Sequence, residues 1–183
     1  MNTLSKKLNY LIIFIFTLIT TTVMNAQVGG WNPELKKEAK GALEEIKKEY
    51  PALDTYVNKS YGYVVFPKVT KAGLGIGGAA GKGIVWKGNT MTGEAKLSQG
   101  SVGLQAGGQQ YSEVIFFENQ AAYDNFTNGK LKFDGQASAV ALKKGASIDA
   151  AYNGGVAVFT KVIGGLMFEA SLGGQHFKFK PKK

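Results

Sequence analysis

The sequence contains no cysteine, no arginine and only one histidine, and these absences exclude several classes of function. Without cysteine the chain has no disulfides, no thiolate metal ligands, no cysteine nucleophile and no cysteine-linked lipid anchor. His176 alone is too little for a structural zinc site, and no Gly-x-Ser-x-Gly motif marks a serine nucleophile. We therefore expect no metal, no cofactor and no catalytic residue, and an enzyme is the function that the sequence supports least.

The positive charge of the chain comes from lysine alone. There are 22 basic residues against 13 acidic ones, and the formal net charge is +9. Arginine is the usual residue for bidentate recognition of phosphates and guanine edges. A basic chain without it favours diffuse attraction to an anionic surface. We therefore expect an anionic lipid or membrane surface as partner, and no nucleic acid.

The N-terminal residues are typical of a secretory signal peptide. Two lysines precede an apolar run at residues 8–23, in the order that signal peptides show. We predict cleavage between Ala26 and Gln27, and hence export to the periplasm or the medium, with a place at the periphery of a membrane. The alternative is a retained membrane anchor, although the run is shorter than the roughly 20 apolar residues of a spanning helix.

The rest of the chain has the length of one domain. We predict a signal peptide at 1–26, a flexible lead at 27–32, a single domain at 33–180 and a basic tail at 181–183. Residues 33–50 have apolar side chains at three- and four-residue steps, which predicts an amphipathic helix. Asn32 is its expected N-terminal cap, and a second short helix is expected to reach about Lys59.

From residue 61 onward, short apolar blocks alternate with glycines and turn residues, which predicts strands. One helix at 120–128 interrupts them, between a cap at Asn119 and Gly129. Segments 64–78 and 157–174 resemble each other, so we expect two related hairpins in one sheet. The predicted fold is α+β, with a glycine-rich, mainly antiparallel sheet that is open or barrel-like. The N-terminal helix and the internal helix pack on this sheet.

The segment AGLGIGGAAGKG at residues 72–83 contains a formal G-x-G-x-x-G motif. A dinucleotide-binding loop requires a helix directly after this motif, but three further glycines follow within ten residues. We therefore predict no nucleotide binding. Gly73, Gly75 and Gly77 instead share one face of a strand, opposite Leu74 and Ile76. A strand face without side chains lets another backbone or an aromatic ring approach closely.

Three segments together resemble the SYLF-domain family. They are YGYVVFPKVTKAGLGIGGAAGKG at 61–83, SVGLQAGGQQYSEVIFFEN at 101–119 and GVAVFTKVIGGLMFEASLGGQHF at 155–177. The resemblance covers about residues 34–179 and is closest to exported bacterial members. Many members have a Trp-x-x-Pro segment before the central strand, and residues 88–99 replace it here. No binding role of that loop is therefore transferred.

The resemblance implies a non-catalytic domain with a lipid-surface role. Eukaryotic members of the family bind phosphoinositide membranes and fungal members bind and bundle actin. In eukaryotic members, a basic amphipathic helix near the start of the domain contacts the lipid. The matching positions here are lysines expected at headgroups and apolar residues expected to insert: Lys36, Lys37, Lys40, Lys47 and Lys48, and Leu35, Leu43 and Ile46. The alternative, favoured by five interspersed glutamates, is a helix packed on the sheet with a solvated charged face.

The C-terminal segment HFKFKPKK has lysines with no acid among them. Near an anionic leaflet, each lysine contributes about 1 kcal/mol. We expect lipid contacts from Lys178, Lys180, Lys182 and Lys183. The alternative is an edge strand that its lysines protect from pairing with another chain.

Two hypotheses about function therefore remain open. The first is an exported, non-catalytic domain that binds a lipid or membrane surface through lysines. The alternative is a structural or self-assembling envelope protein, a homo-oligomer joined by glycine-faced strands with no lipid ligand. A small outer-membrane barrel is disfavoured by the polar N-terminal helix and the lysine-rich C-terminus.

Overall fold

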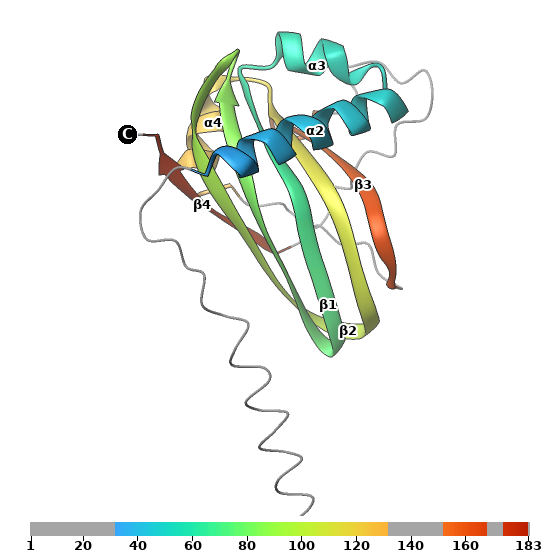
Figure 1. Ribbon diagram of the computed structural model, residues 1–183. Helices are drawn as coiled ribbons and strands as arrows, with labels where there is room; N and C mark the ends of the chain where they lie inside the picture. The colour runs from blue at the N-terminus through green and yellow to red at the C-terminus, as the bar shows by residue number, and fades with distance from the viewer. Residues whose placement is uncertain (1–31, 132–151, 168–173, 183) are drawn as a thin grey trace, which may run out of the picture. The chain divides into compact units, whose positions relative to one another are not determined.

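The structure is a computed structural model that describes residues 32–131, 152–167 and 174–182. Residues Asn32–Lys183 form one compact unit. Its elements, shown in Figure 1, are helices α2 (Pro33–Glu49) and α3 (Leu53–Lys59), strands β1 (Gly62–Lys87) and β2 (Thr90–Phe117), helix α4 (Gln120–Thr127), and strands β3 (Val156–Met167) and β4 (Gln175–Pro181). The α+β fold class is confirmed.

The helices form where their caps and apolar periodicity predicted them. The side chain of Asn32 accepts hydrogen bonds from the backbone N–H groups of Glu34 and Leu35, at 3.0 and 3.3 Å. Asn119 caps α4 in the same way, and Gly129 follows α4 with a φ of +68°, which glycine adopts without strain. None of the described helices combines the length and apolarity needed to cross a bilayer.

The sheet differs from the prediction, because two very long strands replace the short ones expected at 61–117. β1 and β2 pair along their length from Gly62–Phe117 to Lys87–Thr90, with three local shifts of register, and the turn between them lies at residues 88–89. The glycines within β1 and β2 do not end the strands, and Gly107 is accommodated in β2 with a φ of +117°. The apolar block at 138–142, from which the sequence also predicts a strand, lies outside the described residues.

The hairpin of β1 and β2 bends at its middle, so that the two halves of β1 approach each other. A Cβ atom at Gly83 would lie 2.6 Å from the carbonyl oxygen of Val65, and one at Gly62 would lie 2.7 Å from that of Trp86. A Cβ at Gly81 would lie 3.1 Å from that of Lys68. Close backbone approach between the two strand halves thus explains glycine at Gly62, Gly81 and Gly83, rather than at the three positions named from the sequence.

β2 is the central strand. β1 pairs with one edge of it, while β3 pairs with residues 107–117 and β4 with residues 93–99. The two similar segments noted in the sequence flank β2, because Val64 and Val158 both pair with Ile115. The sheet curls over on itself but, in the described residues, does not close.

The curled sheet has a core on each face. The inner core includes Phe66, Ile115, Phe117, Phe126 and Phe177, and α4 packs against it. The outer core joins α2 and α3 to the opposite face, with Ile46, Tyr56 and Trp86 among its members. Helix α2 covers only part of this outer face (Figure 1). The uncovered part of the outer face lies toward the bend of the hairpin.

Candidate functional site

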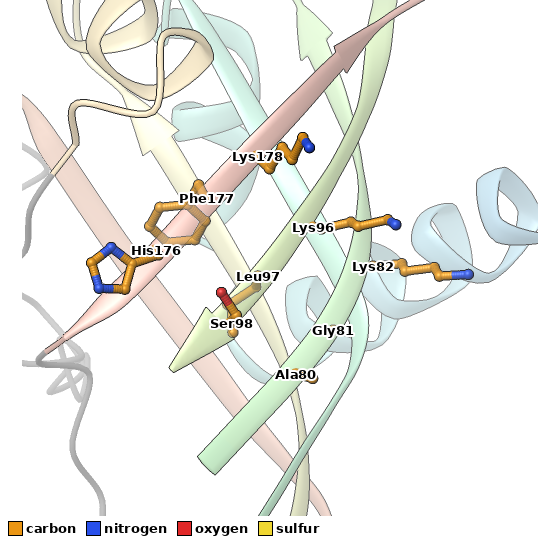
Figure 2. A pocket seen from close by; sticks show the side chains of 9 residues that line it. All are labelled: Ala80, Gly81, Lys82, Lys96, Leu97, Ser98, His176, Phe177 and Lys178. Atoms are coloured by element: carbon orange, nitrogen blue, oxygen red, sulfur yellow. The ribbon is translucent and has the colours of Figure 1, made fainter. Parts of the chain in front are cut away.

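Three lysines lie side by side on the outer face, across three neighbouring strands. Lys82 of β1 pairs with Lys96 of β2, and Lys96 pairs with Lys178 of β4. Directly opposite residues in antiparallel strands have Cβ atoms about 4.5–5.5 Å apart. We name these three residues the lysine row. All three side chains are exposed and extend to the same side of the sheet (Figure 2).

The alternation of the strands fixes this arrangement. On β2, Ala95 and Leu97 are buried in the inner core, so the intervening Lys96 projects outward. On β4, Gln175 and Phe177 are buried, so His176 and Lys178 project outward. Successive strand residues face opposite sides. Packing of the inner core therefore places the lysine row on the surface.

The lysine row lines an open pocket of about 530 Å³. The other residues that line the pocket include no aspartate or glutamate: Ala80, Gly81, Leu97, Ser98, His176 and Phe177. The Ser98 hydroxyl and the His176 imidazole are further hydrogen-bonding groups that line the same pocket. The pocket thus offers positive charge and polar donors without a competing carboxylate.

Within the described ranges the row is not neutralised by an ion pair, although Glu94 lies two residues from Lys96 on the same face of β2. None of its lysines is within ion-pair distance of a described acidic residue. Like charges directly opposite each other across strands are destabilising. An anion bound in the pocket would relieve this repulsion, so the arrangement suits a phosphate or carboxylate group presented from outside.

The lysines predicted on α2 are placed differently. Lys47 forms ion pairs with Glu44 at 3.1 Å and Asp54 at 2.6 Å, and Lys48 pairs with Glu45 at 2.6 Å. The hydrogen bond with Asp54 raises the pKa of Lys47 above its usual value. Lys37 and Lys40 are exposed, and Lys36 is half-buried. The charge of α2 is therefore largely balanced within the domain.

The apolar residues proposed for membrane insertion are core residues in this structure. Leu35, Leu43 and Ile46 are buried in the outer core between α2 and the sheet. This packing agrees with the alternative weighed from the sequence, a helix docked on the sheet with a charged face toward solvent. Insertion of these side chains into a bilayer would require α2 to leave the sheet.

The predicted C-terminal lysines separate into two groups. Lys178 belongs to the lysine row. Lys180 of β4 lies opposite Glu94 of β2 in the strand register. The backbone N–H of Lys182 donates to the carbonyl oxygen of Thr92 at 2.8 Å. Lys183 and the predicted cleavage residues Ala26 and Gln27 lie outside the described residues.

Sequence reasoning missed Lys82, Lys96, Ser98 and the position of His176 beside them. The turn at residues 88–89 was the available signal, because a hairpin's register can be counted from its turn. A regular count would pair Lys82 with Ala95, which faces the inner core. A bulge between Val85 and Trp86 shifts the register by one residue and brings Lys82 opposite Lys96.

A second polar cluster lies in the interior. Glu113 is fully buried, and the Nε2 atom of Gln175 donates to its Oε2 atom at 3.0 Å. Burial raises the pKa of Glu113 to about 7 and raises the pKa of Tyr111 above its usual value. This contact links β2 to β4, so it helps to hold Lys178 in the row. Among the described residues, no group of three or more acidic or histidine side chains could hold a metal ion.

The chain is similar to known proteins over most of its length. Residues 98–182 match the family Ysc84, described as "Las17-binding protein actin regulator". The chain is also similar to "Beta cell expansion factor A" of Aeromonas veronii, with 31% identity over 157 residues, or 80% of this chain. The match spans 59% of that relative's length. The resemblance found in the sequence is confirmed, and the chain carries a domain of the Ysc84, or SYLF, family.

Proposed function

We propose that the protein is an exported, non-catalytic domain that binds anionic membrane surfaces through its lysine-rich outer face. Membership of the SYLF family suggests a lipid- or actin-binding domain, and the family is generally non-enzymatic. An exported protein would meet lipid surfaces rather than actin in its own compartment. The observation that carries the proposal is the lysine row, an open pocket with three cations and no acid.

Sedimentation of the purified protein with vesicles tests this function. We expect binding to vesicles of phosphatidylcholine and phosphatidylserine, and much weaker binding to phosphatidylcholine alone. Added salt should weaken the binding, because salt screens exposed charges. Salt-insensitive binding to both vesicles would contradict a charge-driven mechanism, and absence of binding to either would reject the proposal.

A pair of matched variants locates the binding surface. In the row variant Lys82, Lys96 and Lys178 are replaced by glutamine, and in the helix variant Lys37, Lys40 and Lys48 are replaced by glutamine. Both variants lose three positive charges and share every other residue. Since each lysine at an anionic surface contributes about 1 kcal/mol, we expect the row variant to bind about 100-fold more weakly. The helix variant should change binding much less, and equal losses would show that net charge alone drives binding.

A further inference from the structure

The two most exposed large apolar side chains of the described residues lie on the strand that carries Lys82. Leu74 and Ile76 are 83% and 73% exposed, where the hairpin of β1 and β2 bends. At this bend Leu74 pairs with Ala106 and Ile76 pairs with Val102. Between these two pairs β2 has three residues and β1 has one. A Cβ atom at Gly73 would lie 2.7 Å from the Cα atom of Gly77, which shows how tightly the glycine side of the bend is folded. The bend thus turns Leu74 and Ile76 outward.

Ile76 lies on the same face of β1 as Lys82, the member of the lysine row on this strand. Pairing with β2 is regular from Ile76 to Val85, so Ile76, Gly78, Ala80 and Lys82 alternate with the residues of the opposite face. Between Ile76 and Lys82, the residues on this face are Gly78 and Ala80, which have no side chain larger than a methyl group. Ile76 is about 20 Å from Lys82 along the strand. The face is therefore apolar at the bend, smooth in the middle and cationic at the pocket.

We propose that Leu74 and Ile76 insert into the acyl region of the same membrane whose anionic headgroups the lysine row binds. This inference rests on the proposed function and names the apolar anchor of that surface. A bilayer presents negative headgroups beside a hydrocarbon layer, which matches a face that has lysines and exposed apolar side chains together. The bend of the hairpin lies away from α2 and α3 (Figure 1). No described helix therefore covers the bend and blocks its access to a membrane.

The absence of cysteine permits a direct measurement of insertion. A single Ile76→Cys substitution, labelled with an environment-sensitive fluorophore, reports the polarity around residue 76 without background labelling. We expect a blue shift with phosphatidylcholine–phosphatidylserine vesicles. An Asn89→Cys label at the opposite turn of the hairpin should show no shift. A shift at both positions would show that the fluorophore itself drives insertion, and would overturn the inference.

Matched apolar variants measure the contribution to affinity. Replacing Leu74 and Ile76 with serine should weaken vesicle binding at least about tenfold, because apolar side chains removed from water stabilise the bound state. Val162 and Ile163 of β3 are also exposed, at 58% and 51%. Val162 pairs with Tyr111 and Ile163 lies at the adjacent bulge, so both are beside a different part of β2 from the row. Their replacement with serine is the control and should leave binding unchanged.

The outcomes separate this inference from the proposed function. Wild-type binding to anionic vesicles, with an aqueous environment at position 76 and unchanged affinity of the Leu74/Ile76 variant, would reject insertion and leave the lysine-driven function intact. Absence of vesicle binding by the wild type would reject both. If the wild type oligomerises without lipid and the Leu74/Ile76 variant becomes monomeric in light scattering, the apolar bend binds a second copy of the chain, and insertion is again rejected.

Discussion

The outer face of the sheet has a covered part and a bare part, and the two treat the same residue types in opposite ways. Under α2, apolar side chains such as Ile46 and Trp86 are buried together, and Lys47 and Lys48 pair with acids. Toward the bend, the lysine row forms no ion pair with the described acidic residues, and Ile76 faces solvent. The difference teaches that local pairing, rather than the density of lysines in the sequence, separates a structural surface from a binding surface.

The largest expected effect tests the covered part against the bare part with the same substitution. Ile46 is fully buried, and Ile46→Ala should lower the free energy of unfolding by about 2–5 kcal/mol through lost packing and the cavity left behind. Ile76→Ala removes an exposed side chain and should change it by no more than about 0.5 kcal/mol. Urea denaturation measures both. Equal effects would show that the two isoleucines do not differ in environment, and would break the comparison.

The helices and the core of the covered part could be predicted from the sequence, because their signals are local. Asn32 caps α2, and Leu35, Ala39, Leu43 and Ile46 define its buried stripe at helical spacing. The charge balance of α2 could be predicted only in part. Lys161 of β3 lies 3.6 Å from Glu45, a contact between residues 116 positions apart that no local pattern reveals.

The bare part could not be predicted, because it depends on strand register and on the bend. The sequence predicts Lys178 as a lipid contact but gives no reason to group it with Lys82 and Lys96, because the three meet only when β4 pairs with β2. The bulge at Val85 decides whether Lys82 faces outward with Lys96. The sequence did place Leu74 and Ile76 opposite the glycine face, but not at a bend where both side chains remain exposed.

The buried acid Glu113 sharpens the comparison, because the contact with Gln175 ties β4 to the sheet beside the lysine row. Its pKa is raised from 4.5 to about 7 by burial. Below about pH 4.5 the carboxyl group is protonated in both folded and unfolded chains, so burial of the neutral form carries no ionisation penalty. As the pH rises toward about 7, the unfolded chain ionises first and stability is lost, by at most about 3 kcal/mol.

Glu113→Gln removes this dependence and keeps the side-chain shape. At about pH 8, above the raised pKa, the variant should be more stable than the wild type, and the difference should vanish near pH 4.5. Urea denaturation across this range measures the effect. If the free energy of unfolding depended on pH in the same way in the variant and the wild type, the pKa of Glu113 would not be raised in the folded protein. Vesicle binding by the variant at both pH values would show in addition that binding does not need the charge of Glu113.

The smallest expected effect has opposite signs in the two parts of the face. Lys96 stands between two other lysines, so Lys96→Met should raise the free energy of unfolding by about 0.5 kcal/mol through relief of like-charge repulsion. Lys47→Met should lower it, because Glu44 and Asp54 lose their partner. Both effects should shrink at high salt, since exposed charges are screened. A destabilising Lys96→Met would mean that the lysine row is already neutralised within the protein, and a row without excess charge could not attract an anionic membrane.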